Sequence, residues 1–141
     1  MEKNEIKEKA KKLIRNSKAF ILSTVDGNFP RSRFMGSLVN AGGFRYYMET
    51  FALSNKVAQI KKNPRAELLF FGKDFTQVVN LFGKARIVDS VKIKEYVFNS
   101  FPESGKYFVS FKQKDFGVIE FKAETLEYYT SKSHQHFKVK L

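Results

Sequence analysis

Short apolar stretches separated by turn residues recur along this 141-residue chain. The first covers Ala19–Val25, and an Asp26-Gly27 turn separates it from a second stretch over residues 30–39. This arrangement is typical of a β-hairpin. Further strands are expected at residues 44–49, 66–71, 77–88, 107–111 and 116–121. Hairpin-linked strands in this number favour a closed or nearly closed antiparallel barrel, with an open α+β sheet as the alternative.

Three segments show helical spacing instead. Residues 2–16 carry an apolar stripe among Lys and Glu residues, which predicts an amphipathic helix lying on the barrel. A second helix is expected over residues 53–60, where Ser54 suits the N-cap and Asn63-Pro64 ends the segment. A short third helix is expected near residues 91–97. The chain is therefore expected to be mainly β, of the α+β kind, with six or seven strands and about three helices.

The composition narrows the class of protein. Because 43% of the residues are hydrophobic and 16 are Phe, the chain is too apolar for a disordered tail. Its length suits a single domain over residues 1–141. The absence of Cys excludes disulfides and thiolate metal sites. The charged N-terminus does not resemble a signal peptide, so a cytoplasmic protein with no membrane partner is expected.

The formal net charge of +12 favours an anionic partner. The Lys and Arg residues are dispersed along the chain, whereas a nucleic-acid interface concentrates them on one surface. A phosphorylated small molecule is therefore preferred over nucleic acid, and a basic barrel that binds single strands remains the third choice.

Two segments could meet such an anion. Along the expected second strand, Arg31, Arg33 and Met35 share one face, because side chains alternate along a strand. Since arginine is rarely buried without a partner, that face meets either water or an anion. The expected second helix opens with Ser54 and Lys56, and a helix N-terminus with a hydroxyl and an ammonium suits phosphate.

Four other polar residues stand out. Thr50 precedes the expected second helix and could donate a hydroxyl hydrogen bond, and the Asn80 amide could bind a heterocycle. His134 and His136 would share a face of a strand, but two ligands alone make a weak metal site, so a surface tail and no metal are expected.

Taken in order, the motifs match a known pattern. They are a D-G turn, P-x-x-R-x-M, a strand ending in Thr, S-x-K opening a helix, N-P, and a strand closing on Gly. In this chain they are Asp26-Gly27, Pro30–Met35, Thr50, Ser54-Asn55-Lys56, Asn63-Pro64 and Val78–Gly83. From about residue 10 to 130 the chain resembles the pyridoxamine-5'-phosphate-oxidase-like FMN-binding split-barrel family, and its short general-stress-protein branch in particular.

The resemblance implies a six-stranded split β-barrel that forms a homodimer with FMN at the subunit interface. Arg33 and Lys56 would hold the phosphate, while the backbone near Phe34 and Met35 would lie along the isoalloxazine edge. Tyr129 occupies the place of an aromatic motif in similar proteins. The cofactor-binding residues carried over are Arg33, Phe34, Met35, Thr50, Ser54, Asn55, Lys56, Asn80 and Tyr129.

The function implied is that of a flavin-dependent oxidoreductase acting on an unidentified small molecule, with a reduced nicotinamide as a candidate electron donor. No catalytic residue is evident. Pyridoxamine 5'-phosphate oxidase activity itself is not expected, because the segment 131–141 carries His but not the Arg of the oxidases that perform it. The alternatives are a non-catalytic flavin or haem carrier or sensor, and a deazaflavin in place of FMN.

Overall fold

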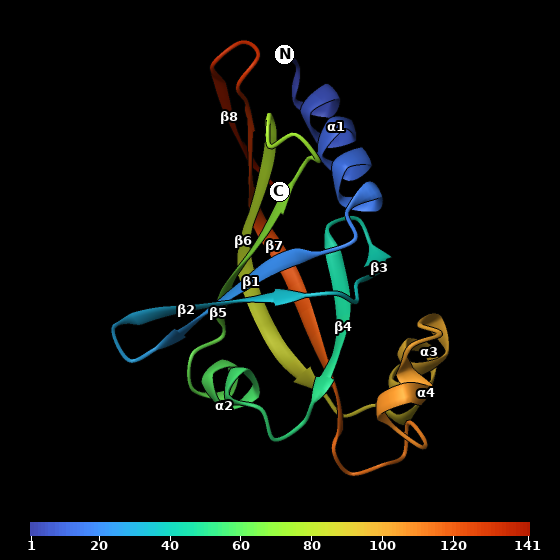
Figure 1. Cartoon of the computed structure of the whole chain (residues 1–141). Helices are drawn as coiled ribbons and strands as arrows, with labels where there is room; N and C mark the ends of the chain where they lie inside the picture. Colours follow the sequence, from blue (N-terminus) through green and yellow to red (C-terminus); the bar gives the residue numbers. More distant parts are fainter.

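A computed structural model describes all residues from 1 to 141, and its main feature is one antiparallel sheet of eight strands. The strands run in the order β2-β1-β5-β6-β7-β4-β3, and β8 also pairs with β7 (Figure 1). The strands are β1 (Phe20–Asp26), β2 (Phe29–Met35), β3 (Val39–Gly42), β4 (Arg45–Phe51), β5 (Arg65–Phe71), β6 (Gln77–Val88), β7 (Phe116–Thr130) and β8 (Gln135–Lys140). The helices are α1 (Lys3–Asn16), α2 (Asn55–Lys62), α3 (Val91–Ser100) and α4 (Ser104–Tyr107).

The long strand β7 organises the sheet. It pairs with β6 from Val118 to Thr130, with β4 through its first half and with β8 through its second half. The β6–β7 ladder contains a bulge, because Phe82 pairs with Thr125 while Gly83 pairs with Ala123. A Cβ at Gly83 would overlap the carbonyl oxygen of Lys122 and lie 2.9 Å from the Cα of Ala123. Only glycine therefore fits at this point of the ladder.

Two apolar clusters hold the elements together. The larger contains 20 buried residues from the inner face of the sheet, from α2, which contributes Ile60, and from α1, which contributes Ile6, Ala10 and Ile14. The smaller lies beneath α3 and α4 and includes Val97 and Phe108. Each fully buried Phe or Leu in these clusters stabilises the fold by about 1.5–3 kcal/mol. None of the helices is long and apolar enough to cross a membrane.

The expected fold class is confirmed, but the number of strands is eight and not six. Residues 36–38 divide the expected second strand into β2 and β3, and the expected C-terminal tail forms β8 against β7. The expected strand at residues 107–111 is wrong, because Tyr107 ends α4 and turns follow. The alternation there arises because Phe108 packs in the smaller cluster while its neighbours are exposed.

Candidate functional site

The ends of β2 and β4, the start of α2 and the α3–α4 segment surround a cavity of about 540 Å³, which we call the β2–β4 cavity. This volume lies within the range of small-molecule sites. The residues that line the cavity are Phe34, Met35, Gly36, Ser37, Glu49, Thr50, Phe51, Lys56, Phe101, Pro102, Glu103, Tyr107 and Phe108.

One wall of the β2–β4 cavity is a free strand edge. β3 pairs with β4 only over Arg45–Tyr47, whereas β7 pairs with β4 as far as Phe51. Residues 48–51 therefore have a strand partner on one side only. An unpaired edge offers backbone N–H and C=O groups, which suit a planar ring that carries both acceptors and donors.

Arg33 is held by neutral oxygen atoms next to this cavity. Its Nη1 donates to the carbonyl oxygen of Leu22 at 3.2 Å and to Oγ1 of Thr24 at 2.8 Å, and its Nη2 donates to Oε1 of Gln59 at 3.0 Å. Burial lowers the pKa of Arg33, and the charge of Arg31 lowers it further. Because no acceptor is a carboxylate, the guanidinium is fixed in place while its charge stays uncompensated.

Lys56 lies in the first turn of α2 and lines the β2–β4 cavity. Its Nζ donates to Oγ1 of Thr50 at 2.9 Å. Burial lowers the pKa of Lys56, and the positive charge of Arg33 lowers it as well. The two cations therefore act on one another, and neither forms an ion pair with a carboxylate. Such a pair of cations is stabilised by an anion placed between them.

Ser54 completes the start of α2 but does not cap it. It occupies the N-cap position with an extended backbone, yet its side chain makes no cap hydrogen bond. Its Oγ is buried and has no hydrogen-bond partner. Since buried polar groups are normally satisfied, this unpartnered hydroxyl is an exception at the start of α2. The unpartnered hydroxyl, the two uncompensated cations and the N–H groups that begin α2 fit a phosphate dianion.

The family model described as pyridoxamine 5'-phosphate oxidase matches residues 6–130. The chain belongs to this family. The pyridoxamine 5'-phosphate oxidase family assignment confirms the prediction made from the order of the motifs. General stress protein 26 of Bacillus subtilis is 28% identical over 106 residues, which cover 71% of this chain and 72% of that protein.

Two solved structures show the same fold. A protein related to general stress protein 26, from Clostridium acetobutylicum, has a TM-score of 0.85 at 21% identity, and the match covers 99% of this chain and 97% of that one. A heme binding protein from Mycobacterium smegmatis has a TM-score of 0.78 at 13% identity, and the match covers 96% of this chain and 57% of that one. The same fold is thus shared by a protein related to general stress protein 26 and by a protein named for heme binding.

The structure brings only some of the expected site residues together. Phe34, Met35, Thr50 and Lys56 line the β2–β4 cavity, and Arg33 lies behind it. The remaining members of the expected set lie elsewhere. Ser54 is buried at the start of α2, while Asn55 faces a separate cavity of about 520 Å³ that is also lined by Arg31. Asn80 and Tyr129 belong to the far ends of β6 and β7.

The position of Tyr129 shows how far these residues lie from the cavity. Gly117 pairs with Thr50, and Tyr129 follows twelve residues later on β7, up to about 40 Å along the strand at about 3.3 Å per residue. Asn80 is also engaged elsewhere, because its Nδ2 donates to Oε1 of Glu67 at 3.0 Å. Within one copy of the chain, neither side chain reaches the cavity. Their expected role in binding therefore requires a second copy.

The two histidines lie in the same distant region. His136 Nε2 is 2.9 Å from Oε1 of Glu127 on β7, and His134 precedes β8 in the turn with a φ of 52°. No group of three or more metal-ligating side chains is present. The segment expected to be a surface tail is thus part of a β-hairpin.

Sequence reasoning missed the residues that position Arg33. Thr24 follows Phe20 and Leu22 on the buried face of β1, so a polar residue at an expected core position was the available signal. Gln59 gave no comparable signal, because its two hydrogen-bond partners lie on other elements.

Glu49 was missed as well. Its Oε2 accepts a hydrogen bond of 2.5 Å from Oγ of Ser104. Burial raises the pKa of Glu49, and the bond from Ser104 opposes that rise. These residues are 55 positions apart, so no local pattern could connect them. The hydrogen bond from Ser104 holds the carboxyl group of Glu49 on the wall of the β2–β4 cavity.

Proposed function

We propose that this protein binds FMN and acts as an oxidoreductase on a small molecule. The observation that carries the proposal is the pair of cations, Arg33 and Lys56, which act on one another and meet no carboxylate; Ser54, two residues before Lys56, has an unpartnered hydroxyl. A phosphate is the group that such an arrangement accommodates. The adjoining cavity of about 540 Å³, with its free β4 edge, has room for a flavin ring.

Each part of the site has a role in this proposal. Lys56 and Arg33 bind the phosphate, and the hydroxyls of Ser54 and Thr50 donate hydrogen bonds nearby. FMN, when bound, supplies the capacity to accept and donate a hydride or single electrons. The protein supplies position, and aromatic side chains from β4 and from the α3–α4 segment line the cavity beside the ring. No side chain acting as a nucleophile is required.

The proposal includes a homodimer. Phe34 on β2, Phe51 on β4 and Tyr107 of α4 all line the β2–β4 cavity, and they are 70%, 48% and 62% exposed. Several large apolar side chains near one site indicate a surface that another molecule covers. A second copy could also bring its own Tyr129 and Asn80 to the cavity, which one copy alone cannot do.

The test is a titration of the purified protein with FMN, followed by the flavin absorbance and by quenching of flavin fluorescence. Lys56→Met should weaken FMN binding by about 10- to 150-fold, since a charge-assisted hydrogen bond contributes about 1.5–3 kcal/mol. Lys61→Met is the matched control, because Lys61 is exposed in the last turn of the same helix. Protein that takes up no FMN would contradict the proposal.

Haem is the second candidate cofactor, because the structurally similar protein from Mycobacterium smegmatis is named for heme binding. His134 and His136 lie on the β7–β8 hairpin, away from the β2–β4 cavity, so an axial histidine would have to come from another copy. A Soret band in the purified protein would favour haem, whereas flavin bands would favour FMN. Oxidation of a reduced nicotinamide by the FMN-loaded protein would separate an oxidoreductase from a flavin carrier.

A further inference from the structure

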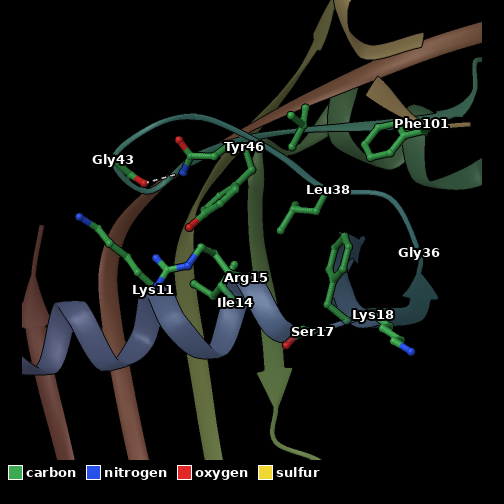
Figure 2. A pocket seen from close by; sticks show the side chains of 13 residues that line it. Lys11, Ile14, Arg15, Ser17, Lys18, Gly36, Leu38, Gly43, Tyr46 and Phe101 are labelled. Carbon is green, nitrogen blue, oxygen red and sulfur yellow. Dashed lines mark hydrogen bonds between the residues drawn. The ribbon is translucent and has the colours of Figure 1, made fainter. Parts of the chain in front are cut away.

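A third cavity, of about 660 Å³, lies between the C-terminal half of α1 and the β3–β4 hairpin (Figure 2). We call it the α1 pocket. None of the residues proposed to bind the flavin phosphate lines it. The residues that line it are Lys11, Ile14, Arg15, Ser17, Lys18, Phe20, Gly36, Leu38, Val39, Asn40, Gly43, Tyr46 and Phe101, and no carboxylate is among them.

One side of the α1 pocket is apolar. Ile14 and Phe20 are buried members of the larger cluster, and Leu38 packs against the same cluster. Val39 and Phe101 continue this surface and pack against the smaller cluster. An apolar surface of this kind gains free energy when a ligand covers it, because water is displaced.

The other side presents positive charge. Arg15 and Lys18 form no ion pair, and Lys11 has only an exposed contact of 3.5 Å with Glu8. Figure 2 shows the side chains of Lys11 and Arg15 extending from α1 toward the loop that carries Gly43. The rim therefore offers cationic donors with little internal compensation.

Tyr46 adds a neutral donor. Its ring points from β4 toward Arg15 (Figure 2), and its side chain is buried. Burial raises the pKa of Tyr46 to about 12, opposed by a hydrogen bond with Asn40 and by the charge of Arg15. The hydroxyl is therefore protonated at neutral pH and can donate a hydrogen bond. Donors and positive charges on one side, with apolar side chains on the other, match an amphipathic anion.

We propose that the α1 pocket binds a small organic anion with an apolar body. The carboxylate, sulfonate or phosphate of such a molecule would meet Lys11 and Arg15, and its apolar part would lie against Leu38 and Phe101. Gly36 and Phe101 also line the β2–β4 cavity, so a ligand in the α1 pocket lies next to the proposed flavin site. The binding itself does not depend on flavin.

A pair of matched probes tests this assignment on the full-length protein. Anilinonaphthalene sulfonate carries an apolar body and an anionic group, and phenylnaphthylamine has the same body without the charge. We expect one molecule of the anionic probe per chain, measured by its fluorescence. Lys11→Gln with Arg15→Gln should weaken binding of the anionic probe by about tenfold or more and leave that of the neutral probe within twofold.

The control is Lys9→Gln with Lys12→Gln, which removes two positive charges from exposed positions of the same helix outside the pocket. Equal weakening by both double variants would overturn the proposal, because it would show attraction by net charge alone. Equal loss of both probes in the pocket variant would also overturn it, as would the absence of saturable binding.

A further measurement separates this pocket from the proposed flavin site. Lys56→Met should leave the affinity for the anionic probe unchanged, and excess FMN should not displace the probe. Displacement by FMN that disappears in Lys56→Met would place the probe in the β2–β4 cavity and overturn the assignment. A protein that binds the probe as expected but takes up no FMN would refute the flavin proposal alone.

Discussion

Replacing Gln59 with glutamate tests whether the uncompensated charge of Arg33 is used for phosphate binding. Oε1 of Gln59 accepts hydrogen bonds from Oγ1 of Thr24 at 2.6 Å and from Nη2 of Arg33 at 3.0 Å. Glutamate has nearly the same shape and keeps both acceptor contacts. It adds a negative charge next to the guanidinium, so an ion pair replaces a neutral hydrogen bond.

The expected effect follows from the contacts. The ion pair removes one of the two free positive charges, which is equivalent to losing one charge-assisted contact with the phosphate, or about 1.5–3 kcal/mol. FMN binding should therefore weaken by about 10- to 150-fold in Gln59→Glu. The ligand-free variant should not unfold at a lower temperature than the wild type, because the new ion pair uses the hydrogen bonds that Gln59 already makes with Thr24 and Arg33.

Titration calorimetry with FMN and with riboflavin, which lacks the phosphate, provides the measurement. Riboflavin affinity should be the same in the wild type and in Gln59→Glu. Gln113→Glu serves as the control, because it makes the same change in net charge at a position outside the site. The reasoning is refuted if FMN affinity does not change, or if riboflavin and FMN are weakened to the same extent.

Three further predictions concern stability and assembly. Gly83→Ala should lower the free energy of unfolding by about 3 kcal/mol, or the melting temperature by roughly 10 °C, because the new Cβ meets backbone atoms of Lys122. Gly105→Ala is the control for this melting experiment, because a Cβ at Gly105 meets nothing within 4 Å. Burial raises the pKa of Glu49, so the folded state binds more protons than the unfolded state and the free energy of unfolding should fall as the pH rises above 4.5. Glu49→Gln should remove this pH dependence, measured by urea unfolding between pH 4 and 7. An unchanged pH dependence in Glu49→Gln would show that Glu49 is not its source. Phe34→Lys should shift the protein from dimer to monomer in analytical ultracentrifugation and weaken FMN binding; a dimer that persists would exclude this face as the interface.

The features that could be predicted from the sequence are those that local chemistry determines. The Asp26-Gly27 turn, the alternation in β1 and the apolar stripe of α1 all depend on residues within one element. Arg33 and Lys56 could be selected because they belong to motifs of fixed spacing. Their position next to one another, which the lowered pKa of Lys56 reflects, is a property of the folded chain.

The remaining features depend on pairing between distant segments. Residues 107–111 alternate like a strand but have no strand to pair with, whereas residues 135–140 form β8 because β7 extends beyond β4 and offers a free edge. The contact between Glu49 and Ser104 similarly arises only after the α3–α4 segment folds onto β4. Propensity cannot distinguish such cases, because it describes each segment without its partners.

The long strand β7 also sets the time at which the proposed cofactor site can form during synthesis. Thr50 of β4 is aligned with Gly117 of β7, so one wall of the cavity is ordered only after most of the chain has left the ribosome. Pairing over such a separation is slow compared with formation of the local β1–β2 hairpin. A nascent chain therefore presents Arg33 early and the completed cavity late, so the proposed cofactor is expected to bind only after β7 has been synthesised.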